Sequence, residues 1–175
     1  MYSMAETYTR YGNFLICSAN LARPYIPRMV PVVAGLILYA GDSFESPVVE
    51  DLHNIPSSAH VLLVKTPRKK EYEFPGGKKE PDETLEEACR REIREEVGFD
   101  KIRDLISLGR KVGWAQDDRN KLVGVAVFHA VGLEGTPGAY SEISDVWLEP
   151  IHRKSQRPIA DITGAYLNEL RQRVA

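Results

Sequence analysis

Short apolar runs, bounded by turn or charged residues, dominate the hydrophobic pattern of the chain and predict a strand-rich fold. β-Branched and aliphatic residues fill most of these runs, which is typical of buried strands. We expect strands or short extended pieces over residues 13–18, 30–40, 60–65, 71–74, 105–112, 122–131 and 146–148. The polar stretch over residues 41–59 is predicted to be a long loop, and loops of that length are often functional or mobile.

The pattern changes to a helical repeat over residues 84–97. Thr84 and Glu87 have the spacing of a capping box, and Gly98 stands where the C-cap of a helix belongs. A second apolar repeat predicts a final helix to about residue 173, with Pro158 in its first turn and an apolar face that covers the sheet. Strands around a central helix, with another helix at the end, predict α/β layers around a mixed sheet.

Three carboxylates lie at the edge of the apolar stripe of the first predicted helix. At about 100° per residue, Glu92, Glu95 and Glu96 fall beside one another and next to the core rather than on the solvated face. Their charges repel, and partial burial raises the cost of that repulsion. A divalent cation such as Mg²⁺ or Mn²⁺ would remove both penalties. The alternative is a surface helix stabilised by Glu–Arg pairs one turn apart, and the helical wheel alone does not decide between them.

A wider spacing pattern surrounds these carboxylates. Its seven fixed positions, with five residues between the first two and seven between the second and third, are Gly77, Glu83, Arg91, Glu92, Glu95, Glu96 and Gly98. This pattern resembles the Nudix box, the signature of Nudix hydrolases, and here it spans residues 77–99. Phe99 stands where an aliphatic residue is commoner. The resemblance extends more loosely over residues 30–148, because the order of the predicted strands also fits.

The resemblance implies a three-layer α/β/α sandwich around a mixed sheet. It also implies Mg²⁺-dependent attack of water on a phosphoanhydride bond, with Mn²⁺ as a substitute, in a nucleoside diphosphate linked to another moiety. Metal ions neutralise phosphate charge and acidify a bound water, which is the physical reason for the requirement. By position, the implied metal ligands are Glu92, Glu95 and Glu96, helped by a backbone carbonyl near Gly76 or Gly77.

The resemblance also assigns the supporting and proton-transfer groups. Arg91 would pair with Glu83 and hold the loop against the helix, a bidentate task that Lys performs poorly. The general base would be Glu92, or a glutamate from a loop before the last strand, for which Glu142 is the candidate. Asp117 and Asp118 are rivals from another loop, and an ordinary solvated loop acid is the alternative for all three. The implied catalytic set is therefore Glu83, Arg91, Glu92, Glu96 and Glu142.

Residues outside the carboxylate cluster are candidates for binding substrate. Arg68 and Lys78 flank the first glycine of the box, and their charges would attract phosphate groups. Arg110 could reach a phosphate or a terminal group, and Trp114 could stack on a base. The alternatives are solvated surface charges for the cations and a half-buried aromatic for Trp114.

Composition narrows the class of protein. The 175 residues, of which 43% are hydrophobic and 27% charged, fit one globular domain. We expect residues 1–28 to be an extension with a possible strand and a possible role in a homodimer, and residues 29–175 to form the Nudix domain. The net charge of −2 makes nucleic acid an unexpected partner. Two cysteines and the lack of an apolar run of about 20 residues favour a cytoplasmic protein with no membrane partner.

Three functions are consistent with the sequence. The first is hydrolysis of a small nucleotide, meaning a nucleotide sugar, ADP-ribose or a nucleoside triphosphate, with a preference for the diphosphate-linked group. The second is a catalytically silent Nudix-fold module that senses a nucleotide, although such modules usually have degenerate boxes and this one is intact. The third is removal of a 5′ RNA cap, which would favour a basic RNA-binding track.

Overall fold

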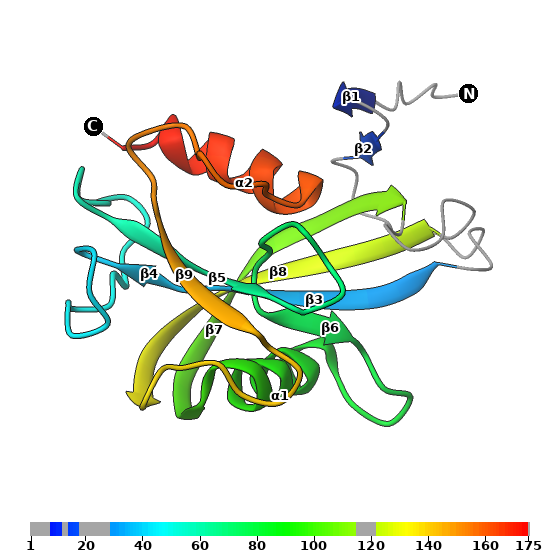
Figure 1. The fold of residues 1–175 in the computed structure, drawn as a ribbon. Coiled ribbons are helices and arrows are strands. Elements are labelled where there is room, and N and C mark those ends of the chain that lie inside the picture. The colour runs from blue at the N-terminus through cyan, green and yellow to red at the C-terminus, as the bar shows by residue number, and fades with distance from the viewer. Residues whose placement is uncertain (1–7, 12–13, 18–28, 115–121, 175) are drawn as a thin grey trace.

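Two β-sheets lie between two helices in the computed structural model, which describes residues 8–11, 14–17, 29–114 and 122–174 (Figure 1). The elements in chain order are β1 (Tyr8–Tyr11), β2 (Phe14–Cys17), β3 (Val30–Leu36), β4 (Leu38–Tyr39), β5 (His60–Lys65), β6 (Gly76–Lys78), α1 (Leu85–Val97), β7 (Phe99–Trp114), β8 (Leu122–Gly135), β9 (Asp145–Pro150) and α2 (Asp161–Arg171). The predicted α/β sandwich with a mixed sheet is confirmed.

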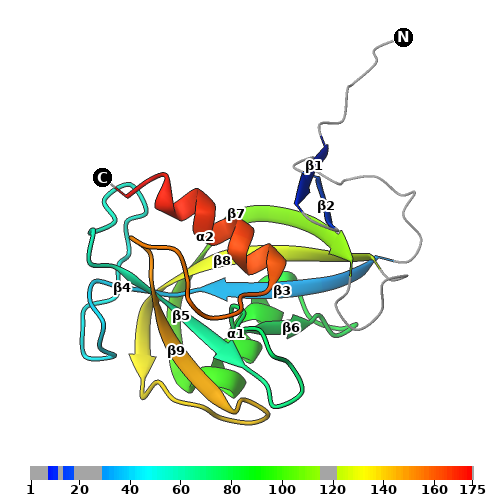
Figure 2. The ribbon, with the colours of Figure 1, turned by 45° about the horizontal axis from the view of Figure 1, so that its top comes forward.

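The larger sheet is mixed and has the strand order β6-β3-β8-β7. β3 and β8 run parallel, whereas β6 on β3 and β7 on β8 run antiparallel. The smaller sheet, in the order β4-β5-β9, is antiparallel throughout. α1 lies below the sheets in Figure 1 and α2 above them, and the turned view in Figure 2 shows the same two layers.

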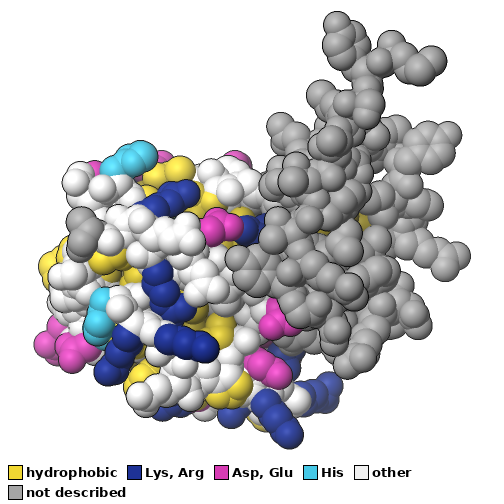
Figure 3. Space-filling model, turned by 90° about the horizontal axis from the view of Figure 1, so that it is seen from above, with side chains coloured by type: hydrophobic (Ala, Val, Ile, Leu, Met, Phe, Trp, Pro, Cys, Tyr) yellow, Lys and Arg dark blue, Asp and Glu magenta, His cyan; other side chains and the backbone are white. Residues whose placement is uncertain are grey.

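Both faces of the central strands are buried, which explains why these strands are continuously apolar in sequence. Along β5, Val61 and Leu63 belong to the core cluster on the α2 side, and Leu62 and Val64 belong to the cluster on the α1 side. Successive side chains of a strand point to opposite faces, so a strand between two helices needs apolar residues at every position. Figure 3 shows the outer, α2 face, where Lys, Arg and His side chains lie among acidic and hydrophobic ones.

Helix α1 has the caps that its sequence predicts. The Thr84 hydroxyl accepts the Glu87 backbone N–H, and the Glu87 carboxylate accepts the Thr84 N–H at 2.7 Å. At the other end, Gly98 adopts the left-handed conformation with φ of 80°. The predicted core stripe is buried, including Cys89 and Ile93. These local signals set where the helix begins and ends, and the packing of its buried stripe against the sheet stabilises it.

Helix α2 begins three residues later than its sequence suggests. Pro158 was expected in the first turn, but its carbonyl accepts the Tyr72 N–H at 2.8 Å, and the Ala160 N–H donates to Tyr72 at 2.9 Å. Residues 158–160 are therefore extended, in a parallel bridge of Ile159 with Tyr72. The predicted apolar cover is confirmed, since Tyr166, Leu167 and Leu170 are buried against the sheet. No helix in the described ranges is both long and apolar enough to cross a membrane.

Several strand boundaries differ from the predicted ones. The single strand expected over residues 30–40 is two strands in different sheets, and Ile37 between them accepts the Leu62 N–H at 2.9 Å. β7 and β8 are longer than predicted, because the ladder between them also includes charged positions outside the predicted runs, such as Lys101 opposite Glu134 and Asp104 opposite Val131. β9 also extends beyond residues 146–148.

The predicted loop over residues 41–59 is fastened to the body of the protein. Val49 and Ile55 are buried in the core cluster on the α2 side. Glu50 accepts hydrogen bonds from Arg103 at 2.8 Å and from the Gly132 N–H at 3.1 Å. These contacts tie the middle of the segment to β7 and β8. Of the predicted extension over residues 1–28, the structure describes the paired strands β1 and β2, and its role in a homodimer stays a prediction.

We expect Gly35→Val to destabilise the protein, because a Cβ at this position of β3 would lie 2.6 Å from Cδ1 of Ile93 on α1. Overpacking of this kind costs about 1–3 kcal/mol, although Val itself suits a strand. Chemical denaturation measures the free energy of unfolding. Gly164→Ala in α2 is the control, since its Cβ would meet nothing closer than Ile159 at 3.9 Å, and it should stabilise by about 0.5–1 kcal/mol. Wild-type stability in Gly35→Val would contradict the close packing.

Candidate active site

Strand β6 and helix α1 bring the glycines and the carboxylates of the box together. β6 pairs with β3 through Gly76 opposite Ala34 and Gly77 opposite Val33. A Cβ on Gly76 would lie 2.1 Å from the Val33 carbonyl oxygen, and a Cβ on Gly77 would lie 2.3 Å from Oε1 of Glu92. Only glycine permits this approach, so the backbone of β6 lies directly against a carboxylate of α1.

Arg91 holds three carboxylates of the cluster at once. Its Nε and one terminal nitrogen donate to the two oxygens of Glu83 at 3.1 and 2.8 Å. The other terminal nitrogen donates to Oε1 of Glu92 at 2.9 Å and to Oε2 of Glu95 at 3.3 Å. The Lys78 carbonyl oxygen also accepts from Arg91 at 3.1 Å. The fork geometry of the guanidinium makes this arrangement possible, and the Glu83 pair is the one that the resemblance implies.

The contact with Arg91 determines the charge state of Glu83. The Arg91 guanidinium, helped by the Glu80 N–H at 2.7 Å, lowers the pKa of Glu83 to about 2. The pKa of Arg91 is in turn raised by its hydrogen bond to Glu83. Both groups are therefore charged across the neutral range, and they join the loop before α1 to the middle of the helix.

Glu96 is the buried carboxyl of the site, with 5% of its surface exposed. Its Oε2 accepts the Gly76 N–H at 2.7 Å. Burial raises the pKa of Glu96 to about 8, and the nearby charges of Glu92, Glu73 and Glu142 act in the same direction, against the Gly76 hydrogen bond. Among the described residues no cationic side chain pairs with it. A buried carboxyl without a counter-charge is a group that a bound cation would stabilise.

Glu92 has a related but milder environment. Burial raises its pKa, Arg91 lowers it, and the charges of Glu95 and Glu142 raise it again. Three carboxylates share the single guanidinium of Arg91, so the cluster is short of positive charge. Oxygen donors of this kind suit a hard divalent cation.

The carboxylate oxygens of Glu92, Glu95 and Glu96 do not converge on one position. Within the part of the chain that the structure describes, no group of three acidic, His or Cys side chains is close enough to hold a metal ion. The reason is visible in the contacts, since Arg91 draws Glu92 and Glu95 towards Glu83, whereas Glu96 turns to Gly76. The ligand roles of Gly77, Glu92, Glu95 and Glu96 stay predictions.

The loop over residues 136–144 places Glu142 near the cluster. The Tyr140 N–H donates to the Glu96 carbonyl at 3.1 Å, and the Ser144 N–H donates to the Lys65 carbonyl at 2.8 Å. Glu142 is exposed between these two attachments, and its charge acts on both Glu92 and Glu96. The other two candidate bases, Asp117 and Asp118, lie outside the described ranges.

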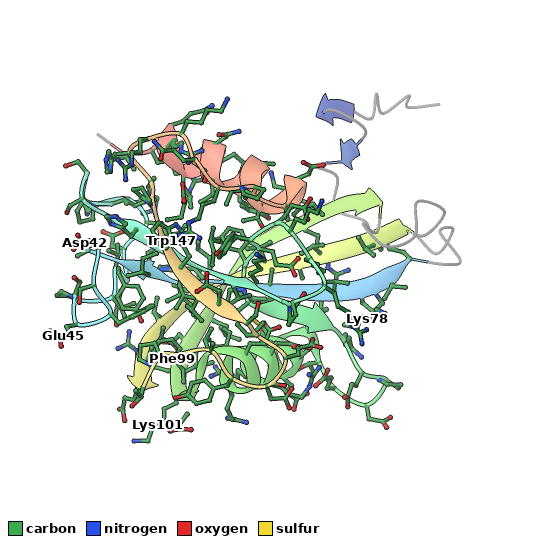
Figure 4. All side chains as sticks on the ribbon, in the orientation of Figure 1. Asp42, Glu45, Lys78, Phe99, Lys101 and Trp147 are labelled. Atoms are coloured by element: carbon green, nitrogen blue, oxygen red, sulfur yellow. The ribbon has the colours of Figure 1, made fainter. Side chains whose placement is uncertain are left out.

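The predicted substrate-binding residues are spread more widely. Lys78 is exposed at the end of β6 next to the cluster, on the opposite side of the molecule from Asp42 and Glu45 (Figure 4). Arg68 is exposed before the segment that leads to β6, and Arg110 is exposed on the edge strand β7. In the described part of the chain, no hydrogen bond or ion pair joins Arg68 or Arg110 to the carboxylates. The side chain of Trp114 is not among those described.

Sequence reasoning missed two neighbours of the site. Glu73 lies close enough to raise the pKa of Glu96. The sequence signal for Glu73 is its place between the two aromatic residues Tyr72 and Phe74. Both are buried, and because successive side chains of an extended segment alternate, Glu73 points to the other face. Tyr140 lies against Gly98 at the end of α1, and no local pattern announces that contact.

Known proteins resemble this chain in sequence and in fold. The family model of the NUDIX domain matches residues 54–159, more than half of the chain. The CTP pyrophosphohydrolase of Escherichia coli (strain K12) is 30% identical over 111 residues, which span 61% of this chain and 78% of that protein. A MutT NUDIX hydrolase from Burkholderia pseudomallei has a TM-score of 0.61 at 20% identity, covering 81% of this chain and 97% of its own. The NUDIX domain of Shewanella oneidensis NrtR, solved with ADP ribose, has a TM-score of 0.61 at 18% identity. The match covers 83% of this chain and 88% of the Shewanella chain.

We expect Glu83→Gln to weaken the acid dependence of stability. The folded-state pKa of Glu83 lies below its ordinary value, so this carboxylate stabilises the fold above about pH 4.5 and loses that contribution as the pH falls towards 2. The variant should be less stable at pH 7, and its stability should approach that of the wild type at low pH. Denaturation at pH values between 2 and 7 measures this. Glu45→Gln, at an exposed position far from Arg91, is the control, and parallel curves for Glu83→Gln and the wild type would contradict the ion pair.

Proposed function

The chain belongs to the Nudix family of hydrolases, and from that membership we propose that it is a divalent-cation-dependent pyrophosphohydrolase of small nucleotides. The observation that carries the proposal is the buried carboxyl of Glu96, held at the backbone of Gly76 and flanked by Glu92, with no cation paired to it in the described residues. Such an arrangement suits a site that receives its positive charge from outside the chain.

The carboxylate oxygens of the cluster are the donors that Mg²⁺ and Mn²⁺ prefer, and to share one ion Glu92 and Glu95 would turn from Arg91 towards Glu96. Glu92, Glu95 and Glu96 would hold the cation, with a backbone carbonyl at Gly77 as a further oxygen donor. When bound, the ion supplies positive charge to phosphate oxygens and lowers the pKa of a coordinated water. Arg91 contacts Glu92 and Glu95 and joins them to Glu83, so it would anchor the loop before α1 and balance part of the negative charge of the cluster. Lys78 is exposed at the end of β6, its backbone carbonyl contacts Arg91, and its ammonium would attract phosphate groups.

We assign the role of general base to Glu142. Glu92 is engaged by Arg91 and lies against Gly77, whereas Glu142 is exposed and close enough for its charge to act on Glu92 and Glu96. In the reaction, the oxygen of a water forms a bond to phosphorus and the phosphoanhydride P–O bond breaks. The water proton passes to the Glu142 carboxylate, and the bridging oxygen leaves with the departing phosphate or pyrophosphate.

Nucleoside triphosphates are the first substrates to test. The support comes from the Escherichia coli relative, which is named for CTP and 78% of which aligns with this chain. The preference for diphosphate-linked compounds, such as nucleotide sugars and ADP-ribose, stays a prediction. Roles for Arg68, Arg110 and Trp114 in binding the base or the terminal group stay predictions.

A second candidate function is nucleotide sensing without cleavage, and a third is removal of a 5′ RNA cap. The complete set of Glu92, Glu95 and Glu96 disfavours a silent sensor. The net charge of −2 disfavours a track for RNA.

We expect Glu96→Gln to lower turnover by about 100-fold or more, equivalent to about 2.7 kcal/mol of barrier. Gln keeps an oxygen for the Gly76 N–H and matches the size of the buried, largely protonated carboxyl, so the fold should be retained. The measurement is phosphate release from nucleoside triphosphates with CTP first, ADP-ribose, nucleotide sugars, dinucleoside polyphosphates and capped RNA, with Mg²⁺ or Mn²⁺.

The matched control is Glu86→Gln, an exposed glutamate on the same helix, which should keep wild-type turnover. Full turnover of Glu96→Gln at saturating Mg²⁺ would contradict the assignment of the cation. No cleavage of any nucleotide by the wild type, together with metal-dependent nucleotide binding, would favour the sensor.

We expect Gly77→Ala to weaken Mg²⁺ binding, because the new Cβ would lie 2.3 Å from Oε1 of Glu92 and displace that carboxylate. Changes that move a metal ligand typically cost about 10–100-fold in affinity. Isothermal titration with Mg²⁺ and with Mn²⁺ measures the effect, and Gly164→Ala on α2 is the control. Equal affinities in Gly77→Ala and the wild type would show that Glu92 is not a ligand.

A further inference from the structure

We propose that Tyr140 is a positioning residue whose ring, set between Gly98 and Gly138, holds the 136–144 loop against the end of α1 and thereby places Glu142 over the site. The inference rests on the proposed function, because it takes Glu142 to be the general base. It adds a residue outside the box to the groups on which turnover depends.

The first contact is between the tyrosine ring and Gly98. Gly98 ends α1 with φ of 80°, a conformation that side chains other than glycine rarely adopt. A Cβ on Gly98 would lie 2.4 Å from Cε2 of Tyr140 and 2.8 Å from the Thr136 carbonyl oxygen. Because Gly98 has no side chain, its backbone can adopt the left-handed conformation that ends the helix. The space that a Cβ would fill is occupied by the ring of Tyr140.

The second contact attaches the same ring to the start of the loop. A Cβ on Gly138 would lie 3.2 Å from Cε2 of Tyr140, closer than ordinary van der Waals contact. The Tyr140 hydroxyl donates to the Thr136 carbonyl at 3.1 Å. The ring thus joins the helix end, the start of the loop and its middle.

Backbone hydrogen bonds also join the 136–144 loop to the end of α1. The Gly138 N–H donates to the Val97 carbonyl at 3.2 Å, and the Tyr140 N–H donates to the Glu96 carbonyl at 3.1 Å. The last carbonyls of a helix lack partners within the helix, so these bonds serve α1 as well as the loop. The backbone of Tyr140 is thus bonded directly to that of Glu96, the buried carboxyl residue of the site.

Beyond Tyr140 the chain turns sharply and is fixed again. Ser141 has φ of 52°, in the left-handed region, and the Ile143 N–H returns to the Tyr140 carbonyl at 3.0 Å. Ile143 is buried in the same core cluster as Ile93. Glu142 is therefore exposed at the tip of a turn that is anchored on both sides.

Burial does not account for the place of Tyr140. Its side chain is one of the exposed large hydrophobic groups among the described residues, with 44% of its surface accessible. A ring that is this open contributes little to the core. The ring instead contacts Gly98 at the end of the helix and Thr136 and Gly138 in the loop, which is what a positioning role requires.

The test uses Tyr140→Ala, Tyr140→Phe, Glu142→Gln and the double variant Tyr140→Ala/Glu142→Gln. On CTP, or on whichever nucleotide of the panel the wild type cleaves fastest, Tyr140→Ala should lower kcat by about tenfold or more and leave KM within about threefold. Tyr140→Phe, which keeps the ring over Gly98, should stay within about threefold of wild-type kcat. The double variant should lose no more than Glu142→Gln alone, because both changes remove the same function.

Hydrogen exchange gives a readout that does not depend on turnover. In Tyr140→Ala the amides of residues 138 and 140 should exchange faster, while the amides of α1 and the melting temperature stay near those of the wild type. In Glu142→Gln these amides should keep wild-type rates.

Three results would overturn the inference. Losses that multiply in the double variant would show that Tyr140 does not act through Glu142 and would leave the proposed base in place. A loss in Tyr140→Phe as large as in Tyr140→Ala would show that the hydroxyl, not the ring on Gly98, is responsible. Wild-type turnover in Glu142→Gln would remove Glu142 from the reaction, and the role of Tyr140 would fall with it.

Discussion

The close contact between α1 and β3 is the constraint on which the site depends. Gly35 leaves room for Ile93, so the helix lies directly on the strand that also pairs with β6. β6 carries Gly76 and Gly77, and the same contact therefore brings their backbone to Glu96 and Glu92. A bulkier residue at any of these glycines would move the helix or the strand, and with it the carboxylates.

Charge is distributed unevenly across this contact. On the outer side of the helix, Glu83, Glu92 and Glu95 share Arg91, and its hydrogen bonds to Glu83 lower the pKa of that residue. On the inner side, Glu96 is buried and receives a backbone N–H but no cation from the described residues, which raises its pKa. The described part of the site therefore has more carboxyl groups than cationic side chains to pair with them. This excess suits a site that binds a cation.

Helix α1 also connects the parts of the site that lie far apart in sequence. Its first turn is capped by Thr84, next to the loop that carries Glu83, and its last turn receives the 136–144 loop through Glu96 and Val97. The box therefore supplies the carboxylates and the helix end on which the later loop rests. The proposed base, Glu142, comes from that loop, about forty positions further along the chain. Because Tyr140 meets Gly98 at that junction, the two segments are coupled by packing as well as by charge.

Local patterns predicted helix α1, its caps and the position of Glu92 and Glu96 at the edge of the core, because these depend on side chains within one or two turns. The same helical wheel was wrong for Glu95, whose side chain is exposed. They also predicted β5 to the residue, since an apolar run bounded by polar residues needs no partner to be recognised. The tertiary structure alone decided where β3 ends and β4 begins, why α2 starts after Ile159, and how Glu73, Tyr140 and Glu142 reach the site. Each of these is set by a strand or a loop that pairs across a long sequence separation, and such pairing leaves no periodic signal in the segments that it joins.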